Sequence, residues 1–431
     1  MREMKDSGIP WIGEIPKDWE VVRNKNVFDN SKTLVGELWN STQLLSLTTK
    51  GIKAVSIGST SGKVPDSYET YQVVEKDNLV MCLFDLDCSA VFSGLSPFQG
   101  MISPAYKVLT IKDGYLPAFY DKWFIYIFDG RKFMFLSKNI RYSLTYDEFA
   151  SLQIVKPSLA EQQRIAEFLD RKCAEVDEMI ALQEQIIEEL KAYKQSVITE
   201  AVTKGLNPDA SMRDSGIEWI GQIPEHWELK PLKFNFKRRS ERNNPIVTTE
   251  RLSLSIDKGV TLYSEKTTNL DRFKEDFTQY QIAHPNDIVL NCMNMIVGAV
   301  GLSKYLGCVS PVYYVIYPSN SKIDSEYYSY LLNTPTIRGV YYSYGKGIYA
   351  IERGEGRVNT CRLKVSYEDF GRFDIPIPPI EEQKDIVIYI KEKCADIDSL
   401  IQTKLLKIDS LKEYKKSIIY EYVTGKREVT E

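Results

Sequence analysis

The chain has 431 residues, with 55 Lys and Arg against 59 Asp and Glu, and only two His. This length suggests two to three domains of about 150 residues each. The hydrophobic content of 43% is enough for buried cores and excludes a disordered chain. The net charge of −4 gives by itself no hint of a nucleic-acid partner.

Targeting signals are missing from the sequence. No run of about 18 apolar residues is present, and the first residues lack the apolar core of a signal peptide, so we expect neither a membrane span nor secretion. The seven Cys are an odd number without close pairing. We therefore expect reduced thiols and a cytoplasmic protein rather than a disulfide framework.

The sequence contains two copies of one pattern. Residues 4–20 recur as residues 212–228, a shift of 208 positions at which 12 of 17 residues are identical. A Gly-x-x-Ser-Pro-x-Tyr motif at 100–106 recurs at 307–313, and from residue 146 onward the shift is 221, so the second copy has gained 13 residues. Two copies of this length indicate two similar modules rather than a solenoid, whose units are about 20–50 residues long.

Each module begins with a mixture of short strands and short helices. The first has β-like runs at 78–83 and 106–111 and a helical segment at 118–124, and the second has β-like runs at 287–290 and 313–317. This pattern predicts two compact α+β domains, which we place at residues 1–157 and 206–378.

A long helix follows each domain, at residues 158–205 and 379–431. Ser158 and Glu161 predict a capping box, in which the Ser158 hydroxyl accepts from the Glu161 amide while the Glu161 carboxylate reaches back. Gly205 ends this helix, and Gly425 follows the end of the second, which opens at a Pro-Pro pair. A helix of about 45 residues is about 65–70 Å long, so we expect these helices to project from the domains or bridge them.

Apolar residues recur every seven positions in both helices, which predicts a coiled coil. One seam position holds Leu169, Val176, Gln183, Leu190 and Val197 in the first helix and Ile390, Ile397, Lys404, Leu411 and Ile418 in the second. We assign the other seam position to Met179, Ile186 and Tyr193, supported by Cys173, Ile180 and Ile187, and in the second helix to Leu400, Ile408 and Tyr414. Gln183 and Lys404 interrupt the seam at equivalent places. They mark a pseudo-two-fold axis if the helices pair antiparallel, or else they occupy a solvent-facing slot at the seam edge.

No catalytic motif is complete. Residues 58–64 resemble a phosphate-binding loop but have three residues between the glycines and no Ser or Thr after the Lys, so we expect a hairpin turn. Residues 65–71 open like a nuclease carboxylate motif, but Tyr71 stands where Lys is required. His226 and His284 are too few for a His-based metal cluster, and the Cys spacings favour core thiols. We therefore expect no catalytic, metal or cofactor site in this chain.

Charge is distributed unevenly along the chain. Residues 160–200 hold ten acids and five bases, and residues 381–421 hold nine acids and eight bases, so the remainder of the chain is mildly basic. Residues 230–245 hold six bases and one acid, interleaved with aromatic residues, and further basic loops lie at 131–142 and 345–359. Arg and Asn can bond two edge atoms of a base, and Lys contacts phosphates, so these loops are candidate DNA contacts. A solvated surface is the alternative.

With these features in place, the whole chain resembles the specificity subunit of a type I restriction-modification system. The resemblance rests on Gly-Ile-Pro-Trp-Ile-Gly-Glu-Ile-Pro-x-x-Trp at residues 8–19 with its echo at 216–227, and on the junctions at 154–165 and 375–386. In the first junction, Lys156-Pro157-Ser158 replaces the Pro-x-Pro-Pro of the family, which stands at residues 376–379.

The resemblance implies a non-catalytic subunit with two target-recognition domains, each reading one part of a split, asymmetric double-stranded DNA site. The two long helices would pair antiparallel, set the gap between the half-sites and bring the chain ends together. The implied partners are two modification subunits, which bind S-adenosylmethionine and methylate adenine, and restriction subunits that use ATP. S-adenosylmethionine, ATP and Mg²⁺ are then expected on those partners, with no cofactor on this chain and no membrane contact.

Arg141 and Arg362 are equivalent under the shift of 221 and are expected in the loop before the last strand of each module. We favour them as DNA contacts, and the alternative is that they pair with carboxylates at 147, 148, 368 or 369. The complete set of candidate DNA contacts is Lys138, Asn139, Arg141, Lys237, Arg238, Arg239, Lys346, Arg357, Asn359 and Arg362.

Two other functions stay open from the sequence. A coiled-coil scaffold whose globular ends bind proteins explains the helices but not the basic loops. A nuclease with unrecognised carboxylates would cleave DNA in the presence of Mg²⁺. Binding of DNA with the modification subunit present, repeated over a salt series, separates the readings.

Overall fold

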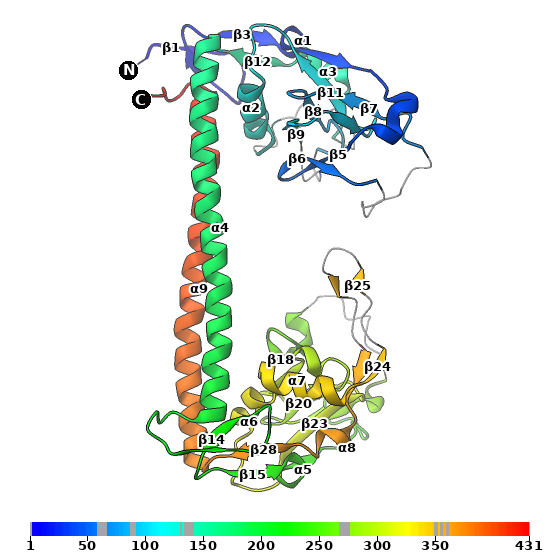
Figure 1. Cartoon of the computed structure of the whole chain (residues 1–431), viewed down its shortest axis with the longest axis vertical. Helices are drawn as coiled ribbons and strands as arrows, with labels where there is room; N and C mark the ends of the chain where they lie inside the picture. The colour runs from blue at the N-terminus through cyan, green and yellow to red at the C-terminus, as the bar shows by residue number, and fades with distance from the viewer. Residues whose placement is uncertain are drawn as a thin grey trace. The chain divides into compact units, whose positions relative to one another are not determined.

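The structure, a computed structural model, describes residues 2–57, 67–86, 92–129, 132, 142–266, 276–348, 352–353, 357–358 and 362–430. It divides into unit 1, residues 1–184 and 405–431, and unit 2, residues 185–404. Each unit contains one α+β domain and one end of two long helices, α4 (Leu159–Lys204) and α9 (Ile380–Val423), as Figure 1 shows. The predicted fold class is confirmed.

The domain of unit 1 is built from two four-stranded sheets and two short ladders. One sheet has the order β4 (Phe28–Ser31), β11 (Lys107–Ile111), β8 (Leu79–Met81), β9 (Ser93–Leu95). The other has the order β6 (Gly51–Val55), β5 (Leu44–Thr48), β10 (Gly100–Ile102), β7 (Gln72–Val74). The ladders join β1 (Met4–Asp6) to β2 (Glu14–Pro16) and β3 (Glu20–Arg23) to β12 (Gln153–Lys156). The helices are α1 (Asn24–Val27), α2 (Pro117–Asp129) and α3 (Tyr146–Ser151), with a 3₁₀ turn at Gly36–Ser41.

Unit 2 repeats this arrangement. Its main sheet has the order β16 (Phe236–Arg238), β23 (Tyr313–Pro318), β20 (Ile288–Asn291), β21 (Val300–Leu302). The equivalent ladders are β13 (Met212–Asp214) with β14 (Gln222–Pro224), β15 (Glu228–Pro231) with β28 (Asp374–Ile377), β17 (Leu252–Ser255) with β18 (Gly259–Leu262), and β19 (Gln281–Ala283) with β22 (Gly307–Val309). The helices are α5 (Leu232–Asn235), α6 (Ser325–Leu331), α7 (Pro335–Tyr344) and α8 (Tyr367–Phe370).

The additional residues of the second module lie after α6. The hydroxyl of Tyr120 donates to the carbonyl of Val155, and that of Tyr328 donates to Pro376, so the two tyrosines are equivalent with a shift of 208. The shift has become 221 by Tyr367, the start of α8. The intervening segment contains α7 and the small ladders β24 (Lys346–Ile348) with β27 (Arg362–Lys364) and β25 (Glu352–Arg353) with β26 (Arg357–Val358).

The Ser-Pro-x-Tyr motif repeats because it forms a turn held by a buried amide. In unit 1 the side chain of Gln72 donates to the carbonyls of Ser103 and Tyr106, at 3.4 and 2.8 Å. In unit 2 the side chain of Gln281 donates to Ser310 and Tyr313, at 2.9 and 2.6 Å. Both modules therefore use the same turn to lead into the central strand of the main sheet.

The helix seam differs from its prediction in one respect. At the first seam position most side chains are buried, namely those of Leu169, Val176, Val197, Ile390, Ile397, Leu411 and Ile418. The others are half-buried, namely Gln183, Leu190 and Lys404. The assignment of the second position was wrong for Met179, Tyr193, Leu400 and Tyr414. The side chain of each is about half exposed and therefore does not lie in the seam. The predicted residues Cys173, Ile187 and Ile408 are buried at this position, and Tyr422 joins them, since the second position follows the first by four residues and not by three.

The helices run antiparallel within each unit. In unit 1 the Lys415 ammonium lies 2.7 Å from the Asp177 carboxylate, and in unit 2 Lys194 lies 2.7 Å from Asp398. These two ion pairs are equivalent under the shift of 221. The role of Gln183 and Lys404 at a two-fold axis stays a prediction. Across the described residues, no helix is both long enough and apolar enough to cross a membrane.

Candidate nucleic-acid interface

The repeated N-terminal motif ties the start of one long helix to the end of the other. In unit 1 the indole N–H of the buried Trp19 donates to the Glu161 carboxylate at 2.9 Å. The ring also packs on Gly425, where an added Cβ would lie 3.1 Å from Trp19 and 2.4 Å from Pro16. Gly425 has a φ of +69°, so it both ends α9 and leaves room for the motif.

Unit 2 contains the same joint. The indole N–H of Trp227 donates to Glu382 at 3.1 Å, and an added Cβ on Gly205 would lie 3.3 Å from the Trp227 ring.

The predicted capping box at the start of α4 is only half formed. The Glu161 amide does donate to the Ser158 hydroxyl at 3.3 Å, but the Glu161 carboxylate reaches the tryptophan rather than back to Ser158.

A buried amide next to each glutamate fastens the domain to its helix. Gln162 accepts from the Leu116 N–H at 2.8 Å and donates to the Pro157 carbonyl at 2.9 Å. Gln383 accepts from the Asp324 N–H at 2.8 Å and donates to the carbonyls of Pro378 and Lys322. Leu116 immediately precedes α2, and Asp324 is the N-cap of α6, so the amides position α2 and α6 on their long helices.

Sequence reasoning missed this joint. The Glu-Gln pair recurs at 161–162 and 382–383, and the sequence predicts only a capping-box role for Glu161. The available signal was that a charged and an amide residue recur at a helix start together with a tryptophan far away in the sequence. What was missing is the contact between them, which periodicity does not encode.

Of the basic segment 230–245, two candidate DNA contacts are exposed. Lys237 and Arg238 lie on β16, the edge strand of the main sheet in unit 2. The Arg238 guanidinium lies 5.1 Å from the ring centroid of Tyr314 and 5.3 Å from that of Tyr367. A cation held over aromatic faces keeps a fixed position while its outer donors stay in solvent.

Arg239 is engaged inside the domain. Its guanidinium makes two hydrogen bonds to the Asp287 carboxylate, at 2.6 and 2.9 Å, and Asp287 is 2% exposed. These bonds, opposed by partial burial, raise the pKa of Arg239 above its ordinary value. Arg239 also lies over the ring of Tyr317. The geometry therefore gives Arg239 a structural role, neutralising a buried carboxylate, and not the role of a free DNA contact.

We expect the substitution Arg239→Ala to lower the free energy of unfolding of unit 2 by about 2 kcal/mol, because it leaves the buried Asp287 charge without its cation. Arg238→Ala is the matched control and should change stability by less than about 0.5 kcal/mol. Urea denaturation of both variants measures the difference. Equal stability losses would contradict the structural role of Arg239.

Three of the other candidates lie in the second half of unit 2. Lys346 begins β24, with its side chain 85% exposed and its ammonium 3.9 Å from Asp369. Arg362 lies in strand β27 rather than in the predicted loop, and Arg357 lies in strand β26. Lys138, Asn139, Arg141 and Asn359 fall outside the described residues. Two of the carboxylates named as alternative partners, Glu368 and Asp369, lie 3.0 and 3.9 Å from Arg372.

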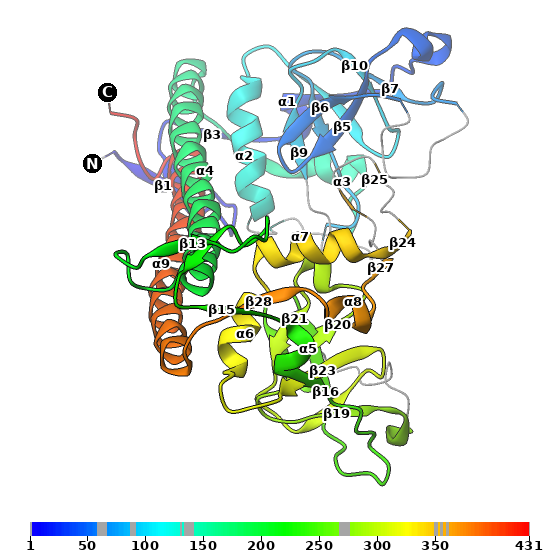
Figure 2. The same cartoon turned by 60° about the horizontal axis from the view of Figure 1, so that its bottom comes forward.

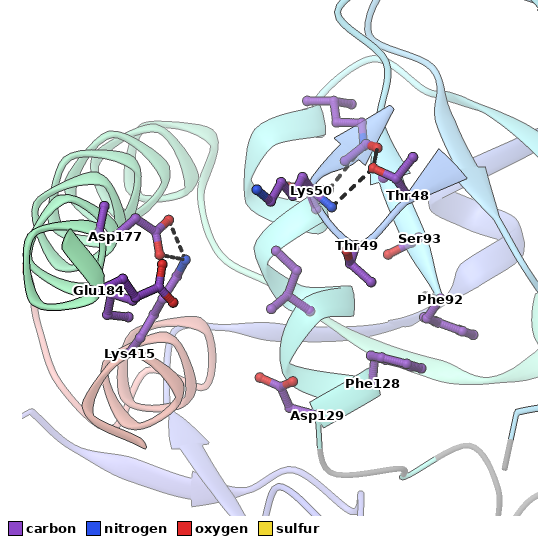
Figure 3. Close-up of a pocket in the computed structure, with 17 residues that line it drawn as sticks. Thr48, Thr49, Lys50, Phe92, Ser93, Phe128, Asp129, Asp177, Glu184 and Lys415 are labelled. Carbon is purple, nitrogen blue, oxygen red and sulfur yellow. Dashed lines mark hydrogen bonds and ion pairs between the residues drawn. The ribbon is translucent and has the colours of Figure 1, made fainter. Parts of the chain in front are cut away.

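A cavity of about 880 Å³ in unit 1 lies between the α+β domain and the helix pair (Figure 3). Its walls carry both signs of charge: Lys50 from the β5–β6 turn, Asp129 from α2, and Asp177, Glu184 and Lys415 from the long helices. Lys415 and Asp177 neutralise each other across the helix pair. Lys50-Gly51 in this turn has an equivalent in Lys258-Gly259 of the β17–β18 turn, and both glycines have a φ in the left-handed region.

Within the described ranges, no cluster of His, Cys, Asp and Glu could hold a metal ion. Burial raises the pKa of the Cys173, Cys292 and Cys308 thiols, which disfavours the nucleophilic thiolate. His226 is half exposed, and its Nε2 lies 2.9 Å from the Glu382 carboxylate.

Comparisons with known proteins agree with this architecture. Residues 16–192 match the model of the type I restriction modification DNA specificity domain. The chain is 23% identical, over 96% of its length and 95% of the relative, to a Methanocaldococcus jannaschii protein assigned as the MjaX specificity subunit of a type I restriction enzyme. It is 24% identical over 64% of its length to the MjaVIII specificity subunit of the same organism, and 26% identical over 59% to the EcoBI specificity subunit of Escherichia coli. It spans 63% and 55% of these two relatives.

Two solved structures share the fold. A chain from a study of complex assembly and conformational transition in the type I R-M system aligns with a TM-score of 0.67, at 14% identity, over 96% of this chain and 99% of that one. The HsdS subunit of Thermoanaerobacter tengcongensis aligns with a TM-score of 0.51, also at 14% identity, over 96% and 98%. Along nearly its whole length the chain is thus similar to specificity subunits of type I restriction enzymes.

Proposed function

We propose that each α+β domain reads one half of a bipartite, asymmetric DNA site and that the long helices set the gap between the halves. The observation that carries this proposal is the joint. The same Trp–Glu bond and the same buried Gln attach both domains to the helices, at 2.9 and 3.1 Å for the two indole bonds. Two domains that share one fold but differ in their exposed surfaces would each recognise a different sequence, which suits a DNA site made of two unlike halves.

The exposed cations of unit 2 support contact with DNA. Lys237 and Lys346 are exposed and project from β16 and β24, and Arg238 is supported by two tyrosine rings. Such cations bind phosphates, and a fixed guanidinium can also reach base edges. The chain would then supply recognition only. Adenine methylation and ATP-dependent cleavage, with S-adenosylmethionine, ATP and Mg²⁺, would belong to the partner subunits.

We expect Lys237→Ala to weaken DNA binding by the complex with modification subunits and to reduce the slope of log affinity against log salt by about one. Lys407→Ala, an exposed lysine on α9, is the matched control and should leave affinity and slope unchanged. The probe is a duplex carrying the N6-methyladenine motif that disappears from the source genome when the gene is deleted.

Arg141→Ala tests the first domain in the same assay. A complex that binds no DNA would favour the protein-binding scaffold.

Exposed apolar side chains on the helices support docking of two equal partners. In unit 1, Met179 and Tyr414 are 50% and 52% exposed and lie within two residues of the Asp177–Lys415 pair. In unit 2, Leu400 and Tyr193 are 50% and 58% exposed and flank the Lys194–Asp398 pair. The two sets are equivalent under the shift of 221. Water-exposed apolar residues on a coiled coil are typical of a protein interface.

We expect the Tyr193→Asp variant to bind one modification subunit instead of two, because the substitution buries a charge in an apolar contact. The double variant with Tyr193→Asp and Tyr414→Asp should bind none, for the same reason. Native mass spectrometry or light scattering of the mixed subunits measures the stoichiometry. Glu189→Asp, an exposed change on the same helix, is the control. Unchanged stoichiometry in the double variant would place the interface elsewhere.

A further inference from the structure

The two recognition domains contact their long helices through ion pairs of opposite polarity. In unit 1 the base belongs to the domain. Lys122 of α2 lies with its ammonium 2.7 Å from Asp170 of α4 and 3.7 Å from Asp121, and its side chain is 16% exposed. Burial would lower the pKa of Lys122, but the two carboxylates raise it overall, so the lysine stays charged. Figure 2 shows α2 running beside α4 in this unit.

In unit 2 the base belongs to the helix. Lys391 of α9 lies 2.7 Å from the Glu326 carboxylate of α6. Asp170 and Lys391 are equivalent under the shift of 221, so one helix position carries an acid in one module and a base in the other. Glu326 precedes Tyr328 by two residues and Lys122 follows the equivalent Tyr120 by two. The two domain residues are therefore one helical turn apart on the same face.

Three other contacts of the joint are common to both modules, while the helix glutamate also pairs with Arg2 in unit 1 and with His226 in unit 2. The indole–carboxylate bond, the buried glutamine and the tyrosine bond to the last strand occur in each unit. Those contacts would form equally well if the domains were exchanged. Among the polar contacts described between domain and helix, the ion pair is the one in which the modules differ in which side supplies the base. The base belongs to the domain in unit 1 and to the helix in unit 2.

We infer that Lys122–Asp170 and Glu326–Lys391 match each recognition domain to its own helix. In an exchanged arrangement, Lys122 would face Lys391 and Glu326 would face Asp170. Repulsion in the wrong pairing, added to attraction in the right one, is an effective source of discrimination between similar partners. Asp170 and Lys391 are each more than half exposed, so solvent screening limits the effect, and Lys122 is the most desolvated member.

A chimera tests this inference with one substitution in two contexts. In the natural full-length chain, Asp170→Lys should lower the Tm by about 3 °C. A shift of this size corresponds to a loss of about 1 kcal/mol in the free energy of unfolding. In a full-length chain whose residues 1–157 are replaced by residues 206–378, Glu326 meets Asp170, and Asp170→Lys should raise the Tm by a similar amount. The same sign of shift in both chains would overturn the inference.

Charge reversal in the natural chain keeps the test decisive if the chimera does not fold. Lys122→Glu should restore the Tm lost in Asp170→Lys, and Glu326→Lys should restore that lost in Lys391→Asp. The crossed combination, Asp170→Lys with Glu326→Lys, should restore nothing because the two residues belong to different modules. Rescue by the crossed pair, or no rescue by the matched pairs, contradicts the inference. These outcomes do not involve DNA and are independent of the proposed function.

Discussion

Replacing Gln162 by Leu is expected to lower the free energy of unfolding of unit 1 by about 3 kcal/mol, since it leaves a buried N–H and a buried carbonyl without partners. The side chain is fully buried and bridges Leu116 to Pro157. The volume is nearly conserved, so the loss comes from the missing hydrogen bonds and not from a cavity. Urea denaturation measures the loss, and hydrogen exchange should localise it to α2 and the first turn of α4.

The neighbouring residue provides a matched control. Gln163 is exposed and bonds only Glu167 on the same helix, so Gln163→Leu should change stability by less than about 0.5 kcal/mol. Gln383→Leu should reproduce the Gln162 result in unit 2, because it removes three hydrogen bonds. If the Gln162 and Gln163 variants lose equal stability, the joint is not held by this amide.

A heptad added to either helix is expected to change the gap between the two DNA half-sites. Seven residues lengthen a helix by about 10.5 Å, which corresponds to about three base pairs along DNA. A whole heptad also preserves the face that forms the seam. The insertion is best made in both helices at once, after residues 184 and 404, where the boundary between units crosses them. Methylome sequencing of the altered strain reads the gap directly.

The control for this experiment adds the same residues where they do not lengthen a helix. Seven residues placed in the linker after Gly205, between α4 and β13, should leave the gap unchanged. A methylated motif with the original gap after insertion in both helices would refute the ruler model, since the spacing would then be set by something other than helix length.

Sequence patterns predicted the elements that depend on local periodicity. The long helices were placed at 158–205 and 379–431 and are observed at Leu159–Lys204 and Ile380–Val423, because apolar heptads and glycine stops are local signals. The strands predicted at 106–111 and 313–317 correspond to β11 and β23. The second seam position was misplaced because Met179 and Tyr193 are apolar, and periodicity does not say which apolar face stays open.

The candidate site was predicted less well, for a physical reason. Arg238 and Arg239 are adjacent and have the same charge, yet one is exposed over tyrosine rings and the other is bound to a buried aspartate. Only the alternation of side chains along extended backbone, combined with the position of Asp287 directly before β20, separates them. Charge counts along a segment cannot make that distinction.

The division of the chain has a consequence for its biosynthesis. Unit 2 is continuous, but the core of unit 1 includes Ile418, Ile419, Tyr422 and Val423 from the end of α9. Tyr422 packs on Phe168 at 4.4 Å between ring centroids, and Tyr420 packs on Tyr126 at 5.3 Å. A domain folds during translation once its residues have emerged from the ribosome. The α+β domain of unit 1 is translated first but is therefore the last to complete its core, and its apolar surface needs protection until α9 is released.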